Sequence, residues 1–267
     1  MYHTIGFIGT GNMGSAVAWA AARSGLAQTI LLANRTPAKA EALAAELPGA
    51  ALSTNEEIAH TAKLIFLGVK PQMMASVLEQ IAPALEERTD RFLLVTMAAG
   101  LTCRRILDMA GLDCPVIRMM PNTPAAIGKG VVQYCGQRAT MDELDSFAAL
   151  IAPAGLVDLV SEGSIDAASA VSGCGPAFVY LMIEALADGG VACGLPRAKA
   201  QAYAAQMVEG AARMVLESGQ HPGALKDAVC SPGGTTIQGV RALEERGFRA
   251  AAMDAVIAAY EKTLKLR

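Results

Sequence analysis

Two glycine-containing segments of this 267-residue chain have the spacing to bind negatively charged groups. The first, Gly9-Thr10-Gly11-Asn12-Met13-Gly14, fits G-x-G-x-x-G between a strand-like and a helix-like segment. There Gly9 permits a tight turn, Gly11 lets the backbone approach a pyrophosphate, and Gly14 lets helix and strand pack closely. The free N–H groups and positive dipole end of the helix suit phosphates. The segment predicts a dinucleotide site; the alternative is a glycine-rich turn without a ligand.

The residues after the second strand-like segment indicate which dinucleotide to expect. A site that prefers NAD usually has Asp or Glu there, bonded to the ribose 2′-OH. This chain has Ala33-Asn34-Arg35-Thr36, and no acid follows until Glu41. Arg35 would pair with a 2′-phosphate that a carboxylate would repel, and Asn34 and Thr36 could donate hydrogen bonds. We predict a preference for NADPH, with NADH possible; the alternative is that Arg35 is an ordinary exposed arginine.

Two further strand ends contain small residues. Gly68-Val69-Lys70-Pro71 ends one apolar run, and Ala98-Ala99-Gly100 follows another. Ligands of open α/β sheets bind at the carboxyl ends of strands. These segments would let the nicotinamide half of the cofactor lie close, and Lys70 could bind a ribose hydroxyl, a phosphate or the substrate, or be solvated.

The second glycine-containing segment lies near the other end of the chain. Ser231-Pro232-Gly233-Gly234-Thr235-Thr236 opens a helical pattern, as does Ser172-Gly173-Cys174-Gly175-Pro176-Ala177. Clusters of unpaired N–H groups at helix starts suit a carboxylate. Helix capping explains one Ser or Thr at the start of a helix. It does not explain the two glycines followed by two threonines in the second segment.

Composition and cysteine spacing limit the other classes of function. The net charge of −3 is unlike the basic footprint of a nucleic-acid binder. We expect no metal site and no disulfide framework, because no CxxC pair occurs and the three histidines do not cluster with cysteines. Reduced cysteines and an N-terminus without a signal-peptide pattern suit the cytoplasm. The apolar run 147–160 is too interrupted to span a membrane.

These motifs require two kinds of scaffold. Up to residue 161, short apolar runs alternate with helical patterns, which predicts an α/β domain: a Rossmann-type, doubly wound sheet. The expected strands are Thr4–Ile8, Thr29–Ala33, Leu64–Val69, Phe92–Thr96, Val116–Met119, Val131–Cys135 and Leu156–Val160, and the expected helices are Asn12–Ser24, Pro37–Glu46 and one near 141–152.

From residue 162 to 267 the patterns are helical, which predicts an all-α domain. Phe178, Leu181, Met182, Ala185 and Leu186 recur at helical spacing, and further helices are expected at 197–217, 235–245 and 250–264. About 105 residues with apolar side chains around much of each helix cannot bury that surface alone. We therefore expect a homodimer through this domain.

Several strings of this chain resemble those of pyrroline-5-carboxylate reductases, over about residues 5–260. The longest is Lys226-Asp227-Ala228-Val229-Cys230-Ser231-Pro232-Gly233-Gly234-Thr235-Thr236-Ile237, preceded by His221-Pro222-Gly223. Others are Ser172–Ala177, Glu184–Val191, Gly194–Arg197, Phe7–Met13, Val69–Pro71 and Met120–Pro124.

The resemblance implies reduction of 1-pyrroline-5-carboxylate to L-proline with NAD(P)H, the last step of proline synthesis. It also implies an intertwined homodimer, which could assemble into a larger homo-oligomer. The cofactor contacts would fall on Ile8, Gly9, Thr10, Gly11, Asn12, Met13, Asn34, Arg35, Asn55, Gly68, Val69, Lys70, Pro71, Ala98, Ala99 and Gly100. The substrate contacts would fall on Ser231, Gly233, Gly234, Thr235 and Thr236.

A cyclic imine with a carboxylate needs one group for its charge and one for its nitrogen. We expect N–H groups near Gly233, Gly234 and Thr235 to hold the carboxylate, and the Thr236 hydroxyl to hydrogen-bond the imine nitrogen and help supply its proton. Two alternatives are a β-hydroxyacid or imine dehydrogenase, which typically offers a lysine as acid, and a non-catalytic NADPH sensor. A sensor would bind cofactor without turnover and has no need of the 231–236 segment.

Overall fold

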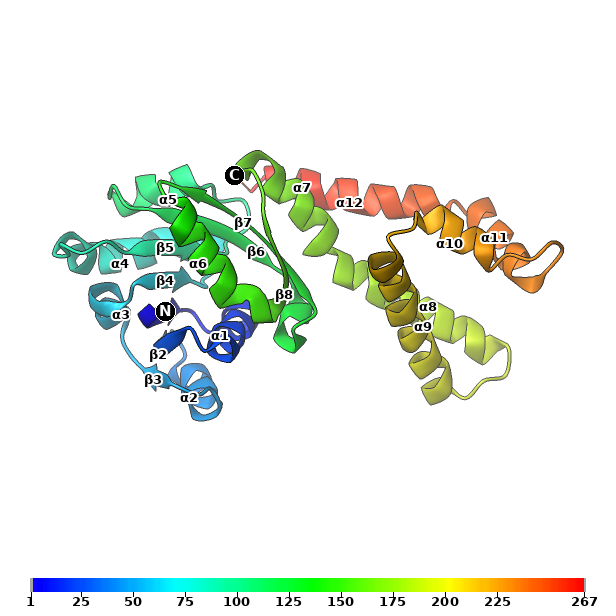
Figure 1. Ribbon diagram of the computed structural model, residues 1–267, viewed down its shortest axis with the longest axis horizontal. Coiled ribbons are helices and arrows are strands. Elements are labelled where there is room, and N and C mark those ends of the chain that lie inside the picture. The colour runs from blue at the N-terminus through cyan, green and yellow to red at the C-terminus, as the bar shows by residue number, and fades with distance from the viewer. Residues whose placement is uncertain (1, 267) are drawn as a thin grey trace. The chain divides into compact units, whose positions relative to one another are not determined.

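The computed structural model describes residues 2–266, and the chain forms two compact units (Figure 1). Unit 1 takes the chain up to Cys174 together with the segment from Ala259 onward, and unit 2 is Gly175–Ala258. The two-domain division predicted at residue 161 is not tested by these compact units, and it stays a prediction. The compact units divide later because helix α7 (Glu162–Ser172) packs against strands β6 and β7 of unit 1.

Unit 1 is built on an eight-stranded sheet in the order β3-β2-β1-β4-β5-β6-β7-β8. The strands are β1 Tyr2–Ile8, β2 Ala27–Ala33, β3 Ala50–Leu52, β4 Leu64–Leu67, β5 Leu93–Thr96, β6 Val116–Pro121, β7 Gly130–Gln137 and β8 Gly155–Leu159. All seven expected strands are confirmed. β3 was not expected, because Ala50–Leu52 is only three residues long and forms no apolar run of strand length.

The pairing changes direction once. β1 to β6 are paired in parallel, β7 runs antiparallel to β6, and β8 is parallel to β7. Only residues 122–129, with the 3-10 turn Thr123–Ile127, join β6 to β7. That connection is too short for a crossover helix, so the chain turns back on itself.

Helices cover both faces of this sheet, as a doubly wound fold requires. Helices α1 (Asn12–Ser24), α2 (Pro37–Glu46) and α6 (Met141–Ile151) contribute to one apolar core. Helices α3 (Asn55–Thr61), α4 (Met74–Glu86) and α5 (Cys103–Ala110) contribute to the other. Sequence patterns gave no separate expectation for these last three; α4 contains Pro83, and α3 and α5 are short.

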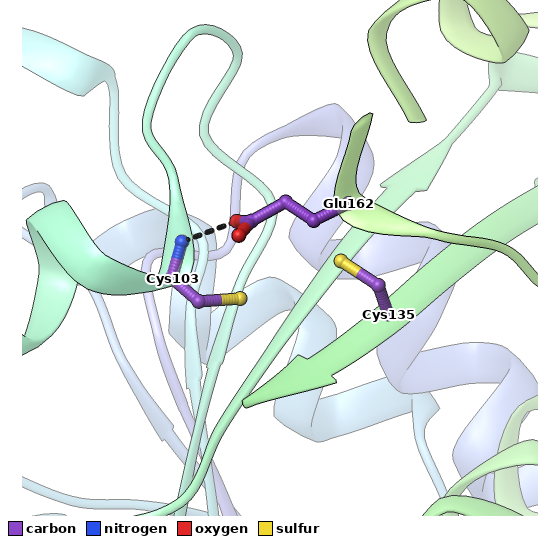
Figure 2. A group of neighbouring side chains, drawn as sticks. All are labelled: Cys103, Cys135 and Glu162. Atoms are coloured by element: carbon purple, nitrogen blue, oxygen red, sulfur yellow. Dashed lines mark hydrogen bonds between the residues drawn. The ribbon is translucent and has the colours of Figure 1, made fainter. Parts of the chain in front are cut away.

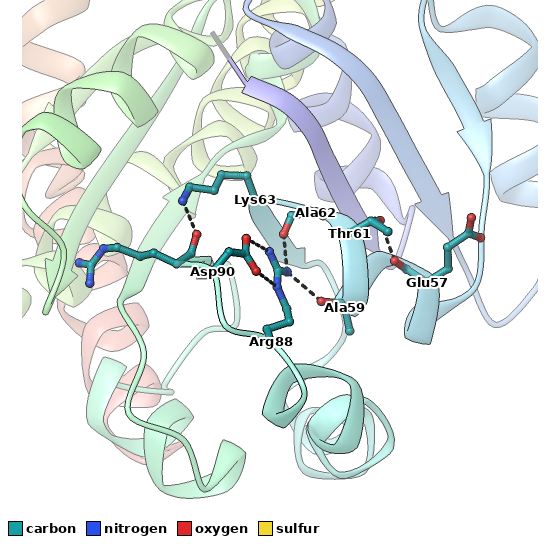
Figure 3. A network of polar contacts seen from close by, with 8 residues as sticks. Glu57, Ala59, Thr61, Ala62, Lys63, Arg88 and Asp90 are labelled. Atoms are coloured by element: carbon teal, nitrogen blue, oxygen red, sulfur yellow. Dashed lines mark hydrogen bonds and ion pairs between the residues drawn. The ribbon is translucent and has the colours of Figure 1, made fainter.

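Arg88 fixes the carboxyl end of α3 (Figure 3). Its Nη1 donates to the carbonyl oxygens of Ala59 at 2.8 Å and Ala62 at 2.7 Å. Its Nε and Nη2 donate to both carboxylate oxygens of Asp90, at 2.8 and 2.7 Å. Hydrogen bonding to Arg88 lowers the pKa of the Asp90 carboxyl below its ordinary value. The guanidinium thus satisfies carbonyl groups that a helix end leaves unpaired.

Unit 2 is all-helical, as expected. It contains α8 (Gly175–Ala192), α9 (Arg197–Ser218), α10 (Pro222–Ala228), α11 (Thr235–Glu245) and the first part of α12 (Phe248–Leu264). Gly190 lies so close to α9 that an added Cβ would be 3.2 Å from the Ala200 Cβ. Small residues therefore set the close approach of α8 and α9.

The expected apolar stripe of α8 is not the face that packs within the chain. Ala187 is buried against Ala200 and Ala204, with Ile183 and Val191 beside them, whereas Leu181 is 67% exposed. Unit 2 also exposes large apolar side chains on its other helices: Tyr203, Met207, Met214, Leu216, Phe248, Met253 and Ile257. By length and composition alone, the stretch Glu162–Ala192 could cross a membrane.

Candidate active site

The glycine fingerprint forms a tight junction between the ends of β1 and β4 and the start of α1. Gly9 has φ +102°, a backbone conformation that favours glycine, and its N–H donates to the Ala33 carbonyl at 2.8 Å. A Cβ on Gly14 or on Gly68 would collide with the Gly9 carbonyl oxygen. Gly9 and Gly14 therefore do the structural work expected of them, and Gly68 completes the junction.

Gly11 faces open space instead. A Cβ built on it would meet nothing within 4 Å, and no side chain caps the start of α1. Beside it, the Thr10 hydroxyl is buried and has no hydrogen-bond partner among the described residues. Free N–H groups at a helix start, open space and an unpaired hydroxyl fit a bound pyrophosphate.

This contrast predicts different results for two substitutions. Gly14→Ala should lower the free energy of unfolding by about 1–3 kcal/mol, because its methyl group has no space. Gly11→Ala should leave that free energy nearly unchanged but raise the cofactor Kd at least about 10-fold, since its methyl group points into the proposed pyrophosphate position. Urea unfolding and cofactor titration measure the two effects; equal cofactor affinity in Gly11→Ala and the wild type would contradict the assignment.

The loop after β2 places its two candidate residues differently. The Asn34 Oδ1 accepts a hydrogen bond from the Thr10 N–H at 3.0 Å, and its Nδ2 donates to the Thr36 carbonyl at 3.0 Å. Asn34 therefore ties the fingerprint loop to the β2 loop. Arg35 is exposed, and its side chain makes no hydrogen bond or ion pair within residues 2–266. Of these two residues, Arg35 is the one whose donor groups are fully available for a phosphate.

The other candidate cofactor residues of unit 1 follow strand ends. Gly68, Val69, Lys70 and Pro71 continue from β4, and Lys70 is exposed. Ala98, Ala99 and Gly100 follow β5; Ala98 and Gly100 are buried, and Leu266 lies against Gly100. Asn55 begins α3 just after β3, and its Nδ2 donates to Gln80 Oε1 at 2.8 Å. The fold thus brings these segments to the carboxyl edge of the parallel strands, around the junction of β1 and β4.

The Ser231–Thr236 segment belongs to unit 2; it follows α10, and Thr235 and Thr236 begin α11. The Gly234 N–H donates to the Ser231 carbonyl at 3.0 Å, and Gly233 has φ +70°. Gly234 precedes α11 without a side-chain cap, and Thr235 and Thr236 are exposed. Neither threonine hydroxyl has a hydrogen-bond partner in the described part of the chain. A tight turn, an uncapped helix start and two free hydroxyls suit a small carboxylate.

Sequence reasoning missed a polar junction that holds the end of α7. Asn122 Nδ2 donates to the Ser172 carbonyl at 2.9 Å, and its Oδ1 accepts from the Val131 N–H at 2.9 Å. Gln133 Nε2 donates to the Ser172 hydroxyl at 2.8 Å. Ser172 therefore anchors its helix to the sheet. The Met120–Pro124 string was a signal for this junction, but its partner lies 50 residues away in the chain.

Comparisons with known proteins cover both units. Residues 162–266 match a family model described as pyrroline-5-carboxylate reductase dimerisation, and residues 4–100 match one described as NADP oxidoreductase coenzyme F420-dependent. The chain is 42% identical to pyrroline-5-carboxylate reductase of Escherichia coli, over 100% of this chain and 99% of that protein. It is equally similar, at 42%, to the enzyme of Pisum sativum, over 99% and 96%.

A solved structure extends this similarity to the fold. Pyrroline carboxylate reductase of Plasmodium falciparum, with NADP bound, superposes with a TM-score of 0.86 at 32% identity. The match covers 99% of this chain and 98% of that one.

Proposed function

This chain belongs to the pyrroline-5-carboxylate reductase family, and on that basis we propose which of its residues perform the family's reaction. It is an NAD(P)H-dependent oxidoreductase that reduces 1-pyrroline-5-carboxylate to L-proline, the last step of proline biosynthesis. The observation that carries this conclusion is the 42% identity over the full length of both chains.

The cofactor, when bound, supplies the hydride. The residues proposed to hold it are those at the carboxyl edge of the sheet: 8–13, Asn34, Arg35, Asn55, 68–71 and 98–100. The open space at Gly11 and the unpaired Thr10 hydroxyl support the pyrophosphate position. The partner-free guanidinium of Arg35 supports a 2′-phosphate and hence a preference for NADPH. Asn34 acts here by positioning the two loops.

Arg35→Asp tests the cofactor preference. A hydrogen bond to a charged group is worth roughly 1.5–3 kcal/mol, so the NADPH Kd should rise about 10- to 150-fold, while the NADH Kd changes little. The matched control is Lys39→Asp, which makes the same charge change at another exposed position on the first turns of α2. Equal losses for the two cofactors, or an equal effect of the control, would contradict the assignment.

In unit 2, the 231–236 segment is proposed to bind the substrate. The Gly234 N–H closes the turn onto the Ser231 carbonyl, so the N–H groups of Gly233 and Thr235 beside it would hold the carboxylate. Its negative charge interacts favourably with the start of α11. The Thr236 hydroxyl would hydrogen-bond the imine nitrogen and pass a proton to it, directly or through water. A protonated imine accepts hydride better at its carbon, so orientation and protonation are the two contributions of these residues.

The reaction is tested by following NADPH oxidation on addition of pyrroline-5-carboxylate, with NADH in parallel. We expect rapid oxidation with proline as the product. Cofactor binding without oxidation would favour the non-catalytic sensor. Oxidation with other imines but not with pyrroline-5-carboxylate would favour an imine dehydrogenase.

We further propose that unit 2 forms a homodimer and that the enzyme works in the cytosol. Its apolar side chains, among them Leu181 at 67% and Leu216 at 80% exposure, are too extensive for a monomer surface. A second copy of the chain would cover these apolar side chains, so no membrane is needed to bury them. Residues 162–266 also match a dimerisation domain. Sedimentation at micromolar protein should give a dimer or a larger oligomer; a monomer would contradict this proposal.

A further inference from the structure

Three side chains with metal-binding atoms meet in unit 1 (Figure 2). Cys103 begins α5, Cys135 lies in β7, and Glu162 begins α7. Their two sulfur atoms and a carboxylate oxygen all lie within 4.8 Å of one another. Both cysteines are buried, at 1% and 4% exposure, and Glu162 is partly exposed.

These separations fit a single zinc ion. Zn–S bonds of about 2.3 Å and Zn–O bonds of about 2.0–2.2 Å place tetrahedral ligand atoms roughly 3.5–4 Å apart. The three atoms therefore need only small side-chain rotations to share one ion. The carboxylate is already oriented, because the Cys103 N–H donates to Glu162 Oε1 at 2.6 Å.

The composition of the cluster also favours a cation. Cys114 shows how an isolated buried cysteine serves as a small apolar residue in this chain. Cys103 and Cys135 differ from it, because the partly exposed carboxylate of Glu162 places a negative charge beside their two thiols. The nearby guanidinium of Arg118 is paired with Asp166, so it does not neutralise Glu162.

We propose that Cys103, Cys135 and Glu162 form a binding site for one zinc ion, with water as the fourth ligand. Binding releases the thiol protons and joins the starts of α5 and α7 to β7. Because α5 follows Gly100-Leu101-Thr102, the ion would also fix the end of the loop after β5. This inference does not depend on the proposed residue roles, and its test does not use activity.

The test uses the full chain, reduced and freed of metal by chelation. Zinc chloride is titrated in competition with a chromophoric chelator, and cobalt(II) is added separately to detect thiolate-to-cobalt absorption. We expect one zinc per chain, a thiolate–cobalt band and a zinc-dependent rise in Tm. Cys135→Ser and Cys103→Ser should weaken zinc binding by more than about 100-fold, the upper range for loss of an outer-shell partner.

The controls are Cys114→Ser, a buried cysteine outside the cluster, and Cys193→Ser, an exposed one; both should bind zinc as the wild type does. Alkylation of wild-type protein with and without zinc, mapped by mass spectrometry, needs no variant. Buried Cys103 and Cys135 are labelled only through local opening, and zinc should slow that labelling further, whereas the labelling rate of exposed Cys193 should not change. The proposal is overturned if no cobalt band forms, if the cluster variants bind zinc like the controls, or if the two thiols oxidise to a disulfide without taking up metal.

Discussion

Thr236→Ala is expected to lower kcat by roughly 10² to 10⁴, the usual contribution of a positioned proton donor. The substrate keeps its proposed carboxylate contacts in this variant, so KM should change much less. Thr236 is exposed near the start of α11, and its hydroxyl has no partner within residues 2–266. The free energy of unfolding should therefore stay close to that of the wild type. Steady-state kinetics and urea unfolding measure these effects.

Two matched variants separate the hydroxyl from the shape of the side chain. Thr236→Ser keeps a hydroxyl and should retain most of kcat, whereas Thr236→Val keeps the shape and should lose as much as alanine does. An alanine variant with full kcat would remove Thr236 from the mechanism. A valine variant with full kcat would show that packing, and not proton donation, is what the position provides.

Asp166→Ala is expected to lower the free energy of unfolding by about 3–5 kcal/mol, the usual cost of leaving a buried charge without its partner. Asp166 in α7 pairs with Arg118 in β6, and both side chains are 0% exposed. Arg118 Nη2 donates to Asp166, and within the described residues Nε and Nη1 have no hydrogen-bond partner. The remaining guanidinium would therefore be buried without compensation. Urea unfolding measures the loss.

Two controls separate burial from charge pairing. Asp113→Ala removes a surface partner, that of Arg138, and should cost only about 0–1 kcal/mol. The double variant Arg118→Met, Asp166→Leu removes both buried charges and should recover much of the stability lost in Asp166→Ala. If Asp166→Ala were no more costly than Asp113→Ala, the buried pair would not be what holds α7 on the sheet.

The linear pattern alone was enough to predict seven strands of the sheet and the strand–turn–helix junction at the glycine fingerprint. Continuous apolar runs such as the expected Leu64–Val69 are typical of strands covered on both faces, and each was found as a strand, here β4 at Leu64–Leu67. The spacing of the glycines was sufficient to predict the structural roles of Gly9 and Gly14, since a strand–turn–helix junction restricts where a Cβ has space. The role of Gly11 toward a pyrophosphate stays a prediction. Such features depend on neighbours within a few residues, so a linear pattern contains them.

Side chains from distant segments meet only after folding, so no local sequence pattern contains these contacts. Arg118 pairs with Asp166, 48 residues later, and that buried contact places α7 with the sheet, although its sequence reads only as a helix. The face of α8 that packs inside the chain was likewise decided by contact with Ala200 and Ala204. The cysteine spacing argued against a metal site, yet Cys103 and Cys135 come together with Glu162 because α5, β7 and α7 converge there. Spacing along the chain reports neighbours on one element, whereas a site built from three elements exists only once the sheet has formed.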